Sequence, residues 1–158
     1  MGMKVGIGQD SHRFLDDKTG KKCVIAGLIF DDVPGLDADS DGDVVFHSLC
    51  NAITSVTHVP ILGKLAIHMC KKEGITDSRC YLEKALETLQ GASIVHVALA
   101  MEGARPRLQA RIDEVRGAVA ETLGIHLEQV GLTITSGDAL TAFGRGEGLQ
   151  CFAVITVQ

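Results

Sequence analysis

Strand-like and helix-like runs alternate along the whole of this chain. Short β-branched or apolar runs predict strands, and apolar residues spaced three or four positions apart predict amphipathic helices. The expected strands cover 4–10, 23–30, 94–101, 130–135 and 149–157, and the expected helices cover 43–56, 78–90 and 107–123. This interleaved order predicts an α/β (α+β) fold, a two-layer sandwich with a mixed β-sheet and its helices on one face.

Turn and capping residues lie between these runs. The polar stretch 15–22 contains Gly20 and favours a hairpin between the first two strands, with Asp10 closing the first one. The segment Ser40-Asp41-Gly42-Asp43 supplies capping side chains for the helix at 43–56. Gly91 and Gly124 follow the other two helices, as expected for helix ends.

Length and composition restrict the class of protein. With 158 residues the chain is expected to form a single domain over 1–158. A net charge of -5, one Tyr and no Trp argue against a nucleic-acid-binding protein, which needs a basic surface and stacking aromatic residues. No apolar run reaches the length of a membrane span, and the first residues lack a signal-peptide core. The five cysteines form no CxxC pair, so we expect reduced thiols and a cytoplasmic protein.

Three residues form a candidate metal site. Asp10 and His12 are two positions apart at a strand end, so their side chains point to the same side. His47 lies on the first turns of the helix at 43–56. One carboxylate and two imidazoles are the ligand set of a catalytic zinc site with an open fourth position. A lone D-x-H pattern is weak, and the alternative is that these are turn and core residues.

Two loops add further candidates. The loop from Asp39 to Asp43 holds more acids than capping requires, and Asp43 is the candidate for orienting a histidine ring. The segment 133–138, followed by 143–148, ends a strand in hydroxyls, glycine and an acid, a combination that can bind a phosphate and its metal. The alternatives are ordinary turns and a structural ion pair between Arg145 and Glu147 at a subunit contact.

These motifs occur together in the order and spacing of a known family. They are DSH at 10–12, SDGD at 40–43, His47, RPR at 105–107 and FGRGEG at 143–148. Over nearly its whole length the chain resembles the 2-C-methyl-D-erythritol 2,4-cyclodiphosphate synthase family. The resemblance implies a lyase of the non-mevalonate (MEP) isoprenoid pathway, which converts 4-diphosphocytidyl-2-C-methyl-D-erythritol 2-phosphate to the cyclic diphosphate and CMP. It also implies a homotrimer around the sheets, with active sites at subunit interfaces.

The resemblance assigns roles to individual residues. It implies one Zn²⁺ per subunit on Asp10, His12 and His47, and Mg²⁺ or Mn²⁺ with the substrate on Asp138. Ser40 takes the place of a phosphate contact and completes the catalytic set. The implied nucleotide pocket consists of Gly103, Ala104, Arg105, Pro106, Arg107, Leu108, Ile134, Thr135 and Ser136. Further implied substrate contacts are Asp39, Gly63, Ser78, Phe143 and Arg145.

The chain also departs from the family pattern. Asp39 replaces a histidine, Asp138 replaces a glutamate, and the segment 61–68 lacks two acids, which predicts a substrate pocket with fewer acids. Two other functions therefore stay open: a zinc-dependent nucleotide pyrophosphatase, and a non-catalytic trimeric protein that binds an isoprenoid diphosphate through Arg145. The strands at 94–99 and 152–157 are largely apolar on both faces, which favours a second buried face and hence an assembly.

Overall fold

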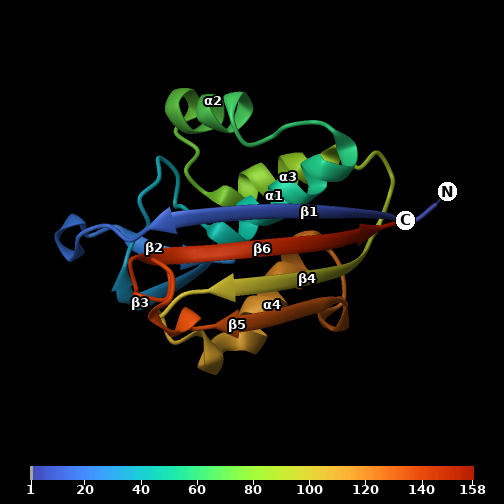
Figure 1. Cartoon of the computed structure of the whole chain (residues 1–158). Helices are drawn as coiled ribbons and strands as arrows, with labels where there is room; N and C mark the ends of the chain where they lie inside the picture. The colour runs from blue at the N-terminus through green and yellow to red at the C-terminus, as the bar shows by residue number, and fades with distance from the viewer. Residues whose placement is uncertain (1) are drawn as a thin grey trace.

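The structure is a computed structural model that describes residues 2–158. A four-stranded mixed sheet is covered by helices on one face, as the sequence predicted (Figure 1). The strands are β1 (Lys4–Arg13), β2 (Lys22–Ile25), β3 (Leu28–Pro34), β4 (Ile94–Glu102), β5 (Val130–Thr135) and β6 (Gly148–Val157). The α-helices are α1 (Val44–Thr57), α2 (Lys64–Glu73), α3 (Ser78–Glu87) and α4 (Ile112–Leu123).

The main sheet has the strand order β1-β6-β4-β5. β6 pairs antiparallel with both β1 and β4, and β4 pairs parallel with β5. β1, β4 and β5 therefore run in the same direction, and their carboxyl ends meet at one edge of the sheet (Figure 1). Most of the candidate site residues predicted from the sequence lie at this edge.

The predicted hairpin between the first two strands is wrong. β1 pairs with β6 from Lys4 opposite Val157 to Arg13 opposite Gly148, so it continues beyond Asp10. The segment 23–30 instead bends at Ala26 and Gly27, both with positive φ, and divides into β2 and β3 of a separate sheet. Local periodicity shows which residues form strands, but the partner of β1 lies at the other end of the chain.

The helices differ from the prediction at their ends and in number. Asp43 caps α1 as expected, α3 stops at Glu87, and α4 begins only at Ile112 after a short 3-10 turn. α2 was not predicted. Among its residues only Ala66 and Met69 are buried, so its sequence lacks the apolar stripe that marks a helix.

Two glycines of β1 let α1 lie directly against the strand. A Cβ at Gly8 would stand 2.8 Å from the carbonyl carbon of Asn51, and closer still to Ser48 O and Ala52 N. Gly6 faces the backbone of Ala52 in the same way. A side chain at either position would separate strand and helix, so the glycines set the distance between the ligand candidates of β1 and that of α1.

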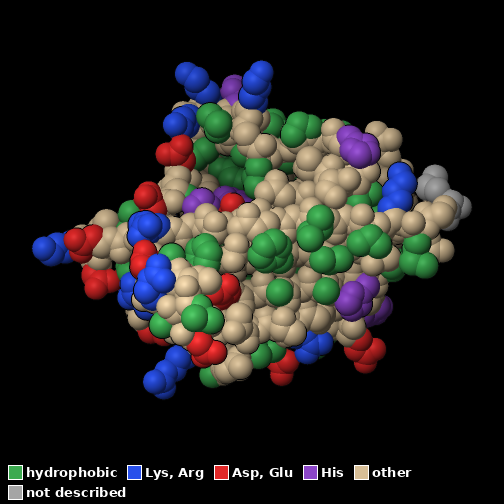
Figure 2. Space-filling view, viewed as in Figure 1, with side chains coloured by type: hydrophobic (Ala, Val, Ile, Leu, Met, Phe, Trp, Pro, Cys, Tyr) green, Lys and Arg blue, Asp and Glu red, His purple; other side chains and the backbone are tan. Residues whose placement is uncertain are grey.

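The other face of the sheet is open. Residues that alternate with the buried ones in β1 and β6 point outward here, and Val5, Ile7 and Phe152 are exposed. Figure 2 shows hydrophobic side chains gathered across the middle of this face. Among the described residues, no helix is both long and apolar enough to cross a membrane.

Candidate metal centre and adjacent cavity

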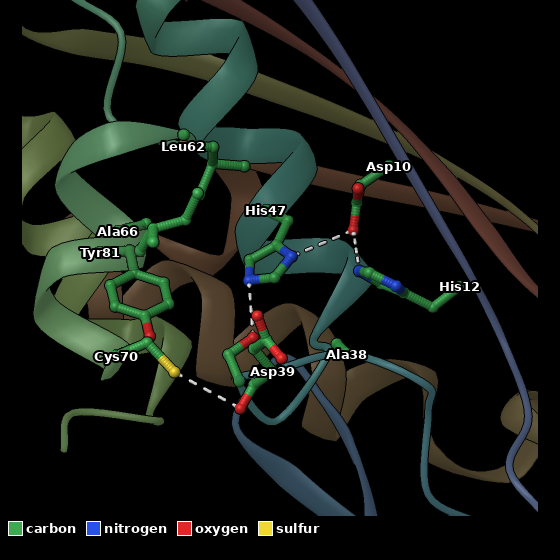
Figure 3. Close-up of a pocket in the computed structure, with 12 residues that line it drawn as sticks. Asp10, His12, Ala38, Asp39, His47, Leu62, Ala66, Cys70 and Tyr81 are labelled. Carbon is green, nitrogen blue, oxygen red and sulfur yellow. Dashed lines mark hydrogen bonds and ion pairs between the residues drawn. The ribbon is translucent and has the colours of Figure 1, made fainter. Parts of the chain in front are cut away.

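Asp10, His12 and His47 converge as the sequence predicted. Asp10 and His12 project from β1 toward α1, and His47 projects from the first turns of α1 toward them (Figure 3). Asp10 Oδ2 lies 3.0 Å from His12 Nε2 and 3.1 Å from His47 Nδ1. The three ligand atoms all lie within 4.8 Å of one another. This grouping requires the β1–α1 contact, because 37 residues separate Asp10 from His47.

The outer nitrogens of both histidines are occupied by other groups. His12 Nδ1 lies 3.0 Å from the carbonyl oxygen of Asp37, to which it donates a proton. His47 Nε2 lies 2.8 Å from Ser78 Oγ, and the Ser78 hydroxyl in turn donates to Asp41 Oδ1. These partners assign the proton of each ring to its outer nitrogen, so the nitrogens that face Asp10 carry lone pairs.

The donor set therefore fits a metal ion. His12 Nε2 is buried and forms no hydrogen bond with any described residue, although it lies 3.0 Å from the Asp10 carboxylate. Two imidazole lone pairs and one carboxylate oxygen converge, and a divalent cation satisfies all three at once. In the metal-free protein the carboxylate of Asp10 raises the pKa of His12, although burial opposes this. Burial by itself would raise the pKa of the Asp10 carboxyl, but the two imidazoles outweigh this effect and lower that pKa.

Asp43 does not orient a histidine, contrary to the prediction. Its buried carboxylate accepts from the backbone N–H groups of Ala26, Gly27, Val45 and Phe46. Burial, together with the nearby Asp41, raises the pKa of Asp43 to about 6. Asp43 therefore caps α1 and fastens it to the turn between β2 and β3.

The orienting role falls to Asp41, through Ser78. Asp41 Oδ2 also accepts from the backbone N–H of Ser78 at 3.0 Å, which fixes the start of α3. Ser78 is fully buried, so its hydroxyl contacts His47 and Asp41 rather than facing the cavity, where the resemblance placed a substrate contact. The acidic loop at 39–43 suggested such a partner, but no local signal shows which acid would reach Ser78.

A cavity of about 270 Å³ opens beside the three ligand candidates. Figure 2 shows it as a hollow with histidine and acidic side chains at its floor. Three of the implied substrate contacts, Ser40, Asp39 and Gly63, line it, and Ser40 Oγ lies 3.4 Å from His47 Nε2. The rest of the wall was not predicted and is mainly apolar (Figure 3): Ala38, Leu62, Ala66, Ile67, Cys70 and Tyr81.

Most of the apolar wall comes from α2 and the segment before it, while Tyr81 comes from α3 and Ala38 from the loop before α1. Ile61, at the position of one missing family acid, is buried in the core. His68, at the position of the other, is exposed and lies 3.3 Å from Glu73, away from the cavity. Neither residue substitutes for a carboxylate in the cavity, so the prediction of a less acidic pocket is consistent with this geometry.

The expected nucleotide residues gather at the same sheet edge but not in this cavity. Gly103 N donates to the carbonyl of Thr135 at 3.0 Å, and Ala104 N donates to that of Phe143 at 3.0 Å. The 103–108, 134–136 and 143 segments therefore form one neighbouring surface. Leu108 is buried, so its side chain belongs to the core.

Asp138 lies in a tight turn, apart from the metal candidates. It has positive φ, as does Ala139, and its carboxylate lies 3.3 Å from Ser136 Oγ. Among residues 2–158, only Asp10, His12 and His47 form a group of His, Cys, Asp or Glu side chains close enough to share one metal ion. Within one chain, Asp138 thus remains a separate acid.

Arg145 forms the ion pair that the sequence suggested. Its Nε lies 3.0 Å from Glu147 Oε1, and Arg13 Nη1 lies 3.2 Å from the other oxygen of Glu147. The two arginines and the glutamate are partly exposed. A second hollow of about 220 Å³ shares His12 with the first cavity. Its lining also includes Ser11, Arg13, Phe143 and Glu147.

A family model and the most similar sequences agree on one family, and solved structures share its fold. The model of the YgbB family matches residues 3–158. The 2-C-methyl-D-erythritol 2,4-cyclodiphosphate synthase of Chlamydia trachomatis serovar L2b is 51% identical over 98% of this chain and 87% of its own length. The fold is similar to that of the bifunctional IspDF of Campylobacter jejuni, with TM-score 0.87 and 24% identity over 99% of this chain and 42% of that one. It is also similar to a CDP-bound 2C-methyl-D-erythritol-2,4-cyclodiphosphate synthase, with TM-score 0.80 and 24% identity over 98% and 100% of the two chains.

Proposed function

This chain belongs to the YgbB family, and we propose that it catalyses the reaction for which its relatives are named. The enzyme converts 4-diphosphocytidyl-2-C-methyl-D-erythritol 2-phosphate to 2-C-methyl-D-erythritol 2,4-cyclodiphosphate and CMP, as a lyase of the MEP pathway. The observation that carries the proposal is the convergence of Asp10, His12 and His47, with inner lone pairs and occupied outer nitrogens, beside an open cavity.

The reaction requires no nucleophile from the protein. The 2-phosphate of the substrate attacks the β-phosphorus, a new P–O bond closes the ring, and the bond to the CMP oxygen breaks. The attacking phosphate is already ionised near neutral pH, so no general base is needed. The task of the chain is to hold the two ends of one substrate in line, which is a problem of proximity and orientation.

Asp10, His12 and His47 would hold Zn²⁺ in this proposal. Zinc prefers this mixture of imidazole and carboxylate ligands and leaves a fourth position open. When bound, it would neutralise charge on a phosphate oxygen of the substrate. The chain orients these ligands for a metal ion, because the Asp37 carbonyl and Ser78 hold the two imidazoles with their lone pairs directed toward Asp10.

The remaining contacts are divided between the cavity and the adjoining surface. Ser40, in the cavity lining, would donate its hydroxyl proton to a phosphate oxygen. Asp138 would bind Mg²⁺ or Mn²⁺ together with the diphosphate, since these ions take one or two carboxylates and phosphate oxygens. Cytidine would occupy the surface formed by 103–108 and 134–136, and the apolar wall around Leu62 and Ala66 would face the methyl-bearing carbon chain of the substrate.

We also propose that the chain assembles as a homotrimer through the open face of its sheet. Ile7 is 59% exposed and Phe152 is 42% exposed, although both lie in the middle of sheet strands. A contiguous exposed apolar face of this kind marks an interface, and cyclic symmetry can bury it in all copies. The separation of Asp138 from the zinc candidates within one chain supports sites completed by a neighbouring subunit.

Product analysis tests the function directly. The purified protein, loaded with Zn²⁺ and Mg²⁺, is incubated with the cytidylyl substrate, and the products are identified by ³¹P NMR. We expect the cyclic diphosphate and CMP. CMP with the linear bisphosphate would indicate a pyrophosphatase, and the absence of turnover would indicate a binding protein. His12→Ala should abolish turnover, whereas His68→Ala, an exposed histidine outside the cavity lining, serves as the matched control.

A further inference from the structure

Lys21 is a lysine whose ammonium group is fully occupied by one loop. Its Nζ donates to the carbonyl oxygens of Leu36, Ala38 and Ser40 at 2.8, 2.8 and 2.6 Å. A lysine ammonium has three protons. All three are therefore engaged by the backbone, and no donor remains for a substrate phosphate.

The two carbonyls between those that Lys21 binds contact a residue of the metal centre and a residue of the cavity wall. The carbonyls of residues 36, 38 and 40 accept from Lys21, whereas those of residues 37 and 39 contact other side chains. Asp37 O accepts the Nδ1 proton of His12, and Asp39 O lies 3.4 Å from the Cys70 thiol of α2. Lys21 thus binds every second carbonyl of a segment whose intervening carbonyls contact His12 and Cys70.

The surroundings of Lys21 are shaped to admit its side chain. A Cβ at Gly35 would stand 2.7 Å from Lys21 Cγ and 2.7 Å from its carbonyl oxygen, so only glycine leaves room there. Gly35 N also donates to Lys21 O at 2.9 Å. Without Lys21, three carbonyl oxygens beside the acids Asp37, Asp39 and Asp41 would lose their donor.

We propose that Lys21 is a positioning residue for the metal centre. It holds the 36–40 segment so that the Asp37 carbonyl keeps the His12 proton on Nδ1 and leaves Nε2 free to bind the metal. The inference rests on the proposed metal site of Asp10, His12 and His47. It assigns Lys21 no contact with substrate.

The sign of one measurement separates positioning from a simple effect of charge. Removing a nearby positive charge should by itself strengthen the binding of a cation. Removing a group that orients a ligand should weaken it, by about tenfold for partners that lie behind the first ligands. The two explanations thus predict opposite changes in metal affinity.

The experiment measures Zn²⁺ dissociation constants by chelator competition on the metal-stripped full chain, with Co²⁺ absorption as a check on ligand geometry. We expect Lys21→Met to bind Zn²⁺ about tenfold more weakly and to show an altered Co²⁺ spectrum. Lys21→Arg, which keeps charge and donors, should recover part of the loss. Lys22→Met is the matched control, because Lys22 is exposed and pairs with Asp31 instead. Unchanged or tighter binding by Lys21→Met would overturn the proposal.

Two further variants cover the other outcomes. If Lys21→Met fails to fold, Gly35→Ala displaces the lysine side chain while keeping its charge, and wild-type zinc affinity in that variant would refute the positioning role. If the wild type and His12→Ala bind Zn²⁺ equally well, the metal site itself is wrong, and both proposals fall. If His12→Ala loses zinc binding as expected but the Lys21 variants bind zinc like the wild type, only the inference about Lys21 fails.

Discussion

Replacing Gly8 by alanine should damage the metal centre without touching any ligand. Gly8 lies two residues before Asp10 on β1, and Ser48, whose carbonyl a new Cβ would meet, directly follows His47 on α1. The Cβ would also stand 2.8 Å from the carbonyl carbon of Asn51. Because carbon atoms in contact prefer roughly 3.5–4.0 Å, α1 must move away from β1 by about 1 Å or more.

This displacement is large compared with what a metal site tolerates. Ligand distances are held within about 0.2 Å in a working site. His47 moves with α1, whereas Asp10 and His12 stay with β1, so the ligand set opens. We expect zinc affinity to fall more than tenfold and kcat/KM to fall about 100-fold, the scale of a 1 Å misplacement. Overpacking should also cost about 1–3 kcal/mol of folding free energy.

The assay combines zinc titration of the metal-stripped protein with turnover and urea unfolding. Gly131→Ala is the matched control, because it changes a glycine of the same sheet where a new Cβ meets only Val97 O, at an ordinary 3.7 Å. If Gly8→Ala binds zinc and turns over like Gly131→Ala, then the close β1–α1 contact does not set the ligand geometry.

Four other changes have defined outcomes. Ser78→Ala removes the acceptor of the His47 Nε2 proton and should weaken zinc binding about tenfold, while equal dissociation constants would exclude the orienting role. Asp43→Asn leaves buried backbone donors facing an amide group and should lower the free energy of unfolding in urea by about 2–4 kcal/mol. A loss below about 0.5 kcal/mol would contradict this. Gly117→Ala lies in α4 with nothing within 4 Å of the new Cβ, so the same measurement should show a gain of about 0.5–1 kcal/mol, and any loss would refute it. Ile7→Glu places a charge on the open sheet face and should give monomers in light scattering, whereas a persistent trimer would show that another surface assembles the chain.

The sequence alone predicted the parts of this protein that depend on neighbouring residues. The period-2 spacing of Asp10 and His12 placed both side chains on one side of a strand, and the capping residues before Val44 located the start of α1. Local backbone geometry decides such features, so they can be read from short windows of sequence. Spacing also proposed His47 as their partner but left open whether the three residues converge, and the family motifs favoured convergence.

The tertiary structure decided the features that depend on distant contacts. The pairing of β1 with β6 joins the two ends of the chain, and the hairpin expected from the local pattern does not form. The same holds for the polar groups behind the ligands: Asp41 reaches Ser78 across 37 residues, and Lys21 binds a loop that begins 15 residues later. Many acids and lysines in a sequence could fill such roles equally well. The side chains that meet are selected by two packing contacts, that of α1 onto Gly6 and Gly8 and that of the 36–40 loop around Lys21. A hydrogen bond forms only within about 3 Å, and the periodicity of a sequence carries no information about that distance.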